Sequence, residues 1–289
     1  VLVAMGGNFR EAMPDPGYVD RALSSIPLRV HIDIMLSNQM LVDPADTVVV
    51  LPAMTRYEIP GGITQTSTER RIMFSPEIEG PRIGEARPEW QLFTELAGRV
   101  RPDLAERVAF SGTQAIREEI ARVVPAYAGI ETLRKTGDQV QYGGPHLAAG
   151  WNFPTANGRG SFSVVDLPDA AIPEGTFALA TRRGKQFNTM VHEKSDAMTG
   201  AASRDAVFMH EADARALGLA DGDPVMLRNE FGEMTGRVYF SRIQPRNVQV
   251  YWPEGNVLLD HRRRSPQSHV PHYNAFVTIE PAAVAHAAD

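Results

Sequence analysis

The sequence has no cysteine among its 289 residues. This absence excludes disulfide bonds, thiolate metal ligands and cysteine nucleophiles within the chain. It agrees with a reducing compartment, where disulfides are rare. We therefore expect a cytoplasmic protein, and a periplasmic location stays open.

Other absences narrow the functional class. No apolar run approaches the roughly 18 residues of a membrane-spanning helix. The formal net charge is −6, from 29 basic and 35 acidic residues, which argues against a general nucleic-acid-binding protein. The sequence shows no P-loop, no Ser-His-Asp order and no metal-ligand spacing. We therefore expect a cofactor or other parts of the protein to supply the chemistry.

The first residues, "VLVAMGGN", show neither an initiator methionine nor a signal peptide. They read as a buried strand and a turn, so we expect a piece of a longer polypeptide. A chain of 289 residues has room for one large domain or two domains of about 150 residues. The hydrophobic content of 43% and the charged content of 22% are typical of a folded protein.

The first half of the sequence alternates strand-like and helix-like segments. This alternation predicts a parallel α/β sheet. Pro125 would end the last of the helices. We expect strands near 1–5, 27–33 and 46–53, and helices at 17–26, 87–100 and 112–127.

The second half of the sequence differs from the first in composition and in its pattern of predicted elements. Residues 137–160 are rich in glycine and proline and predict a connector. The short strands that follow predict a closed β-barrel or a sandwich, with one helix within 210–223. We place one domain with its connector at 1–155 and a second at 156–289. The strands are expected at 161–167, 176–181, 205–210, 223–232, 234–241, 247–252 and 274–280.

The "MGGN" motif at Met5–Asn8 directly follows the first predicted strand. Glycines at this place let backbone N–H groups approach a phosphate or nucleotide. The full G-x-G-x-x-G pattern is missing, and a plain strand-to-helix turn explains the motif equally well.

The segment "ATRRGKQFNTM" at 180–190 places cations and amides at the end of a predicted strand. Its cations could bind phosphate oxygens, and its amides and hydroxyl could bind a polar heterocycle. A solvated surface loop is the competing interpretation. The cations are Arg183 and Lys185, and the hydrogen-bonding side chains are Gln186, Asn188 and Thr189.

Other candidate motifs have simpler explanations. The run 60–71 predicts a turn and an ion-paired hairpin. Arg262–Arg264 predict a solvated basic patch. His269 and His272 lack neighbouring carboxylates or cysteines, which argues against a metal site.

Six motifs in order reveal a family resemblance that covers nearly the whole chain. They include "MGGN", "GGITQTSTERR", "TRRGKQFNT", "HEADARALGLADGDPVMLRNEFG" and "SPQSHVPHYNAFVTIE". The chain resembles the C-terminal part of a molybdopterin oxidoreductase of the dimethyl-sulfoxide-reductase superfamily, in particular formate-dehydrogenase-like alpha subunits.

The resemblance implies the later half of an α/β dinucleotide-type domain, followed by a double-psi β-barrel of the aspartate-decarboxylase-like type. It implies molybdenum or tungsten held by two molybdopterin guanine dinucleotides. An iron–sulfur cluster and the metal ligand are expected in an N-terminal region outside this chain. The implied reaction is two-electron oxidation of formate to carbon dioxide, with an electron-transfer partner subunit allowed.

The resemblance also assigns cofactor-binding residues, and it assigns no catalytic residue or metal ligand to this chain. Arg182, one step out of phase on its strand, is expected to be a solvated surface residue. Many relatives carry lysine where this chain has Asn274. The assigned residues are Gly6, Gly7, Asn8 and Asp33 in the α/β part, Thr181, Arg183, Lys185, Gln186, Asn188 and Thr189 on a barrel loop, and Asn256, Tyr273 and Asn274 in the tail.

Two alternatives to a formate dehydrogenase remain open. A nitrate or oxo-anion reductase of the same superfamily would differ at a metal ligand that this sequence does not include. A non-enzymatic double-psi barrel binding module would explain why the chain has no catalytic set of its own.

Overall fold

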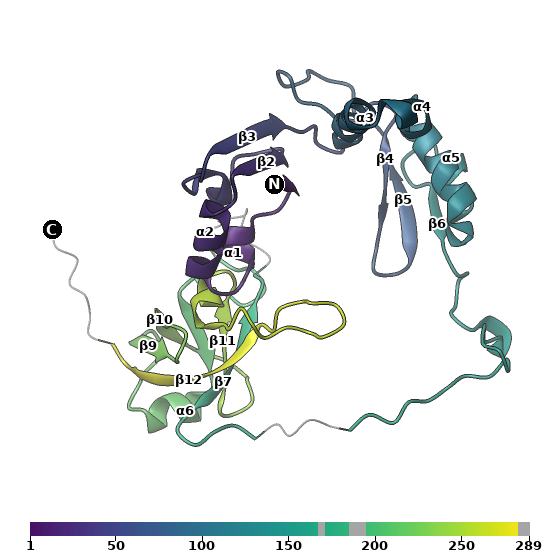
Figure 1. The fold of residues 1–289 in the computed structure, drawn as a ribbon. Helices are drawn as coiled ribbons and strands as arrows, with labels where there is room; N and C mark the ends of the chain where they lie inside the picture. The colour runs from purple at the N-terminus through teal and green to yellow at the C-terminus, as the bar shows by residue number, and fades with distance from the viewer. Residues whose placement is uncertain (167–170, 185–194, 283–289) are drawn as a thin grey trace.

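The structure is a computed structural model that describes residues 1–166, 171–184 and 195–282. Figure 1 shows a small parallel sheet beside a barrel, and a third, antiparallel part reached by long connections. Four predicted cofactor residues, Lys185, Gln186, Asn188 and Thr189, lie outside the described residues.

The parallel sheet has three strands in the order β1-β2-β3, and both pairs are parallel, as predicted. Helix α2 begins where the Asp15 carboxylate accepts a hydrogen bond from the Tyr18 N–H, with Pro16 as the first helical residue. The helix buries Val19 and Leu23. The elements are β1 (Leu2–Met5), α1 (Phe9–Ala12), α2 (Pro16–Ser24), β2 (Leu28–Asp33), the 3₁₀ helix η1 (Asn38–Leu41) and β3 (Thr47–Pro52).

The second part is an antiparallel sheet of order β4-β5-β6 with three helices. Its core contains Ile72, Phe74, Ile130 and Leu133. The predicted hairpin is confirmed, and its ion pair joins Glu69 to Arg71. The elements are β4 (Ile63–Thr66), β5 (Arg71–Ser75), α3 (Glu89–Val100), η2 (Pro102–Leu104), α4 (Ala105–Val108), α5 (Thr113–Val123), η3 (Pro125–Tyr127), η4 (Ile130–Thr132) and β6 (Gln139–Gln141).

Two predictions near the connector are wrong. Residues 139–141 form β6 because β5, far upstream, offers them a free edge, and a local pattern cannot reveal such a partner. Residues 161–166 form no strand, and Phe162 and Val164 are fully exposed. The barrel closes with six strands, so it leaves no edge to which this segment could add.

The barrel has the closed strand order β10-β8-β11-β7-β12-β9, which confirms the predicted fold. Two pairs, β7 with β11 and β8 with β10, are parallel, and the others are antiparallel. The inward residues of β10 include Met234 and Val238, which alternate with exposed ones. The elements are β7 (Phe177–Arg182), β8 (Ala206–Met209), α6 (Glu211–Ala216), β9 (Pro224–Arg228), β10 (Glu233–Phe240), β11 (Asn247–Tyr251), η6 (Glu254–Leu258) and β12 (Asn274–Pro281).

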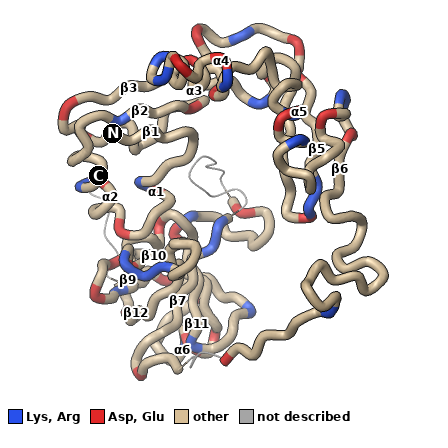
Figure 2. The backbone as a smooth tube through the Cα atoms, turned by 45° about the vertical axis from the view of Figure 1, so that its right-hand side comes forward, with Lys and Arg blue, Asp and Glu red and all other residues tan. Residues whose placement is uncertain are grey.

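The connection between β6 and β7 contains the predicted domain boundary at 155/156, which stays a prediction. Its described residues, 142–166 and 171–176, include the short 3₁₀ helix η5 (Ala149–Trp151). Figure 2 shows acidic and basic residues interspersed along the described chain, with no dominant basic stretch. The described residues include no helix long and apolar enough to cross a membrane.

Candidate cofactor-binding site

A cavity of about 340 Å³ lies where β7 and β11 end and β12 begins, and Thr181, Arg183, Trp252 and Tyr273 line it. The Thr181 N–H donates a hydrogen bond to the Tyr273 carbonyl at 3.1 Å, so the backbone holds these two lining residues together. Three of these four residues are among those predicted to bind the cofactor. The structure therefore brings Thr181, Arg183 and Tyr273 into one site.

Trp252 is the lining residue that the sequence analysis missed. The Arg183 guanidinium lies over its indole, 5.6 Å from the ring centroid, in a cation–π contact. A stacked guanidinium presents N–H donors at its edge in a fork that matches phosphate oxygens. The available signal was an aromatic residue directly after a barrel strand, at the same end as the predicted cations.

The Gly-Gly-Asn turn follows β1 at the carboxyl edge of the parallel sheet. Gly6 and Gly7 have φ of 66° and 79°, a conformation that favours glycine. A Cβ added at either glycine would meet nothing within 4 Å, so this backbone borders open space. Asn8 is only 8% exposed, and its buried Oδ1 has no hydrogen-bond partner within the described chain. The turn thus offers accessible backbone and an unused acceptor.

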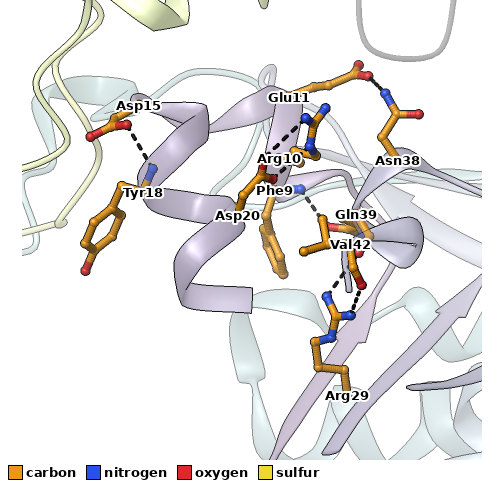
Figure 3. A network of polar contacts seen from close by, with 10 residues as sticks. All are labelled: Phe9, Arg10, Glu11, Asp15, Tyr18, Asp20, Arg29, Asn38, Gln39 and Val42. Carbon is orange, nitrogen blue, oxygen red and sulfur yellow. Dashed lines mark hydrogen bonds and ion pairs between the residues drawn. The ribbon is translucent and has the colours of Figure 1, made fainter. Parts of the chain in front are cut away.

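Gln39 braces this turn from behind (Figure 3). Its Oε1 accepts a hydrogen bond from the Phe9 N–H at 2.7 Å, as Figure 3 shows. Its Nε2 donates to the Gly7 carbonyl at 2.8 Å. Arg29 in turn donates to the carbonyls of Gln39, at 3.2 Å, and Val42. Gln39 and Arg29 are 1% and 0% exposed. No local pattern marks Gln39, which lies about 30 residues from the turn in a short 3₁₀ helix.

Helix α1 joins the turn to the barrel cavity. The Ala12 carbonyl at its end accepts hydrogen bonds from the Tyr273 hydroxyl at 2.9 Å and from Trp252 Nε1 at 3.2 Å. Burial raises the pKa of Tyr273, which keeps this hydroxyl protonated and able to donate. A helix of four residues spans about 6 Å. The turn and the cavity are therefore one helical turn apart.

A second set of contacts fixes the same junction. Asn256 is fully buried, and its Nδ2 donates to the Glu11 carbonyl at 2.6 Å. The Asp15 N–H donates to the Asn256 carbonyl at 3.1 Å, and the Asp15 carboxylate contacts His261 Nδ1 at 2.9 Å. The His261 ring stacks on Tyr18 with centroids 4.1 Å apart. Asn256 thus joins sheet to barrel, while its Oδ1 stays buried and without a partner among the described residues.

Asp33 and Asn274 occupy different positions. Asp33 ends β2, and its carboxylate accepts a hydrogen bond from the Ile34 N–H at 2.7 Å. It lies at the same sheet edge as Gly6, whose N–H donates to the Ile32 carbonyl. Asn274 lines two other cavities, because neighbouring strand residues point to opposite sides. The structure therefore does not place Asn274 in the cavity of Tyr273.

Among the remaining candidates, Arg262 matches its simpler interpretation. Arg262 pairs with Asp260 at 2.9 Å and its side chain is 68% exposed, as expected for a surface cation. The described residues contain no group of three or more histidines and carboxylates arranged to hold a metal ion. Arg182 departs from its prediction, because only 26% of its side chain is exposed and it pairs with the buried Asp196.

The comparisons with known proteins agree with this geometry. Residues 177–277 match the family model described as "Molydopterin dinucleotide binding domain". The barrel is therefore similar to domains of this family over nearly all of its strands. Its match spans Thr181, Arg183, Trp252 and Tyr273, which are the four residues of the cavity.

Relatives align with nearly the whole chain. An uncharacterized oxidoreductase of Mycobacterium tuberculosis (strain ATCC 25618 / H37Rv) is 29% identical and aligns with 98% of the chain and 39% of its own length. Protein YdeP of Escherichia coli (strain K12) is 25% identical over 97% of the chain and 40% of its own length. The F420-dependent formate dehydrogenase subunit alpha of Methanocaldococcus jannaschii is 29% identical over 82% of the chain and 36% of its own length. The chain thus spans about two fifths of these relatives.

A solved structure shows the same fold. Acetylene hydratase from Pelobacter acetylenicus aligns with 98% of the chain and 44% of its own length, with a TM-score of 0.63 and 17% identity. The predicted resemblance to molybdopterin oxidoreductases is confirmed.

Proposed function

We propose that this chain is the cofactor-binding C-terminal part of a molybdenum or tungsten oxidoreductase that uses two molybdopterin guanine dinucleotides. The observation that carries the proposal is the cavity of Thr181, Arg183, Trp252 and Tyr273 on a molybdopterin dinucleotide binding domain. The Gly6–Gly7 turn lies one helical turn away and supplies a second candidate contact for a dinucleotide.

The residues present fit such a ligand. Arg183 offers a stacked fork of donors for phosphate oxygens. The Gly6–Gly7 turn offers backbone without side-chain obstruction, and of its two N–H groups that of Gly6 already donates to the Ile32 carbonyl, which leaves Gly7 as the candidate donor. The buried Asn8 Oδ1 could accept a hydrogen bond from a ribose hydroxyl or a base N–H. When bound, the metal–dithiolene centre supplies two-electron redox chemistry.

The proposed role of this chain is to hold and orient the dinucleotides and to neutralise their phosphate charges. Each dinucleotide brings phosphate charges, and charges removed from water need close counter-charges and donors. We assign this task to Arg183 and to Lys185, and we assign recognition of the heterocycle to Gln186, Asn188 and Thr189. The iron–sulfur cluster and the metal ligand are proposed to belong to a part of the protein outside this chain, so the chain alone would be inactive.

Formate is the proposed substrate, because two relatives are named F420-dependent formate dehydrogenase alpha subunits. A second candidate is a reductase for nitrate or another oxo-anion. Relatives that align with 97–98% of the chain carry only the names oxidoreductase or YdeP, whereas the formate dehydrogenases align with 75–82%. Because the relatives that align with more of the chain are not named formate dehydrogenases, both substrates should be tested.

The test uses the full-length protein as purified. We expect molybdenum or tungsten by elemental analysis, a pterin dinucleotide in the released material, and formate-dependent reduction of a dye. Nitrate-dependent oxidation of a reduced dye, without formate activity, would favour the second candidate. Purified protein without metal and pterin would overturn the proposal, and capture of a protein partner by that material would favour a binding module.

The variant Arg183→Gln tests the cavity itself. Charged hydrogen bonds contribute roughly 1.5–3 kcal/mol, so we expect about 10- to 100-fold weaker retention of the dinucleotide. Arg242→Gln, which replaces another arginine of the barrel outside the cavity, serves as the matched control. Equal retention in both variants would contradict the assignment of Arg183.

A further inference from the structure

A buried polar cluster lies next to the cavity, between the ends of β7 and β11 and the loop 196–201. It consists of Arg182, Asp196, Thr199 and Tyr251, and is called the Asp196 cluster below. Asp196 and Tyr251 are both 0% exposed. The Tyr251 hydroxyl donates to Asp196 Oδ2 at 2.8 Å and lies 3.0 Å from Thr199 Oγ1. Arg182 approaches the same carboxylate oxygen at 3.9 Å.

Aromatic rings form the floor of the cluster. The Arg182 guanidinium lies 5.2 Å from the centroid of Phe208 and 5.8 Å from that of Tyr251. Phe208 in turn makes edge contacts with Tyr251 and Tyr239. Arg182 is therefore held by a carboxylate and two rings, which is more than a solvated surface cation needs.

Asp196 also begins a tight loop that is closed by backbone hydrogen bonds. The Gly200 N–H donates to the Asp196 carbonyl at 2.7 Å, and the Asp196 N–H donates to the Ala201 carbonyl at 2.9 Å. Ala201 is fully buried beside the rings, and the Tyr239 hydroxyl donates to the Thr199 carbonyl at 2.7 Å. The loop 196–201 is thus fastened to the barrel by side chains and backbone.

The carboxylate of Asp196 is kept charged despite its burial. Burial alone would raise the pKa of Asp196, but the Met198 N–H, the hydroxyls of Tyr251 and Thr199 and the charge of Arg182 bring it below its ordinary value. Burial, with a smaller contribution from Asp196, raises the pKa of Tyr251 to about 12. Both groups therefore keep fixed roles, acceptor and donor, at neutral pH.

The cluster and the cavity occupy alternate positions on the same strands. Arg182 pairs with Tyr251 between β7 and β11, and the Trp252 N–H donates to the Arg182 carbonyl at 2.9 Å. Arg183 and Trp252 directly follow the ends of these strands and line the cavity. Movement at Arg182 or Tyr251 would therefore be passed to the cavity walls.

We propose that Arg182, Asp196 and Tyr251 are positioning residues for the cofactor site. They tie the end of β7 to Asp196, and so hold both ends of the segment 183–195 at a fixed separation. That segment carries Arg183 and the predicted cofactor residues Lys185, Gln186, Asn188 and Thr189. The link from these residues to a cofactor rests on the proposed function. Their effect on the ends of the segment 183–195 does not depend on it.

Limited proteolysis of the full-length protein tests the mechanical role. Trypsin can cut within the segment after Arg183, Lys185 and Lys194. In Asp196→Asn, which keeps the side-chain volume, we expect cleavage there about tenfold faster than in the wild type, because a charged contact is lost. Tyr251→Phe should accelerate it about three- to tenfold and is the milder variant if Asp196→Asn does not fold. Arg182→Gln in the Asp196→Asn background should add less than its own single effect, because no unpaired cation is left.

Two controls separate positioning from general loss of stability. Asp205→Asn makes the same chemical change at an exposed ion pair with Arg237 nearby, and should leave the rate unchanged. Ile279→Val weakens the barrel wall elsewhere. Equal acceleration by Ile279→Val, or none by Asp196→Asn and Tyr251→Phe, would overturn the proposal.

A second readout links the cluster to the cofactor. We expect the pterin dinucleotide to dissociate about tenfold faster from Asp196→Asn than from Asp205→Asn. Faster proteolysis in a protein that never contains pterin would uphold the cluster and overturn the proposed function instead. Faster proteolysis with unchanged dissociation would overturn the positioning role.

Discussion

Replacing Gln39 by leucine should loosen the Gly-Gly-Asn turn without touching the barrel. Gln39 is the partner of two backbone groups, the Phe9 N–H at 2.7 Å and the Gly7 carbonyl at 2.8 Å. Leucine has a similar size but can pair with neither group. Each unsatisfied buried group costs about 1–3 kcal/mol. Both hydrogen bonds are partly buried, so we take about 1–2 kcal/mol each and about 2–4 kcal/mol together.

Amide hydrogen exchange of the full-length protein, followed by mass spectrometry, measures this cost locally. If the turn opens as a unit, a loss of about 2–4 kcal/mol means about 30- to 1000-fold faster exchange in peptides covering residues 6–13. Peptides from β7 to β12 should exchange as in the wild type, apart from those that contact α1.

The control is Gln244→Leu, which makes the same replacement at an exposed position in the barrel. Surface substitutions of this kind change stability by less than about 0.5 kcal/mol. Exchange at residues 6–13 that is unchanged in Gln39→Leu, or that changes equally in Gln244→Leu, would refute the bracing role of Gln39.

Two further predictions concern stability. Burial lowers the pKa of His31, with Arg29 adding to the effect, so the folded state keeps it neutral while the unfolded state protonates near its ordinary value of 6.5. The contribution of His31 to the free energy of unfolding is therefore fully present above pH 6.5 and is lost as the pH falls below this value. In His31→Gln, the free energy of unfolding measured by chemical denaturation should depend less on pH. Gly236→Ala should destabilise the barrel by about 1–3 kcal/mol, since its Cβ would lie 2.6 Å from both the Asp205 carbonyl and Val207 Cγ2. Thermal unfolding measures this loss, and an unchanged midpoint would contradict it.

Local patterns predicted the elements well where the partners follow nearby in the chain. The alternation in 234–241 predicted β10, and the β-branched run in 46–53 predicted β3. The failures at 139–141 and 161–166 concern short segments whose structure depends on a free strand edge. β6 finds one on β5, and 161–166 finds none, because the barrel is closed. Such edges are a property of the tertiary fold, which a local pattern does not contain.

The sequence predicted several individual residues of the candidate site but not how they are arranged in space. Thr181, Arg183 and Tyr273 do share a cavity, although Tyr273 lies about 90 residues after the other two in the sequence. Trp252 could have been suspected from its place after a strand. Gln39 could not, because its importance comes from two hydrogen bonds to a distant turn, and glutamine has no preference that would mark this role.

The strand alternation at the ends of β7 and β11 explains why adjacent arginines have different roles. Arg182 faces Asp196 and the aromatic rings, whereas Arg183 lies over Trp252 at the cavity. Charge count alone treats these residues as one basic pair, but a strand directs neighbouring side chains to opposite sides. Substitutions at Arg183 should therefore change ligand retention while the segment ends stay fixed, and substitutions at Arg182 should first release those ends. The same division applies to Tyr251 and Trp252 on the partner strand, so binding and positioning can be separated one residue at a time.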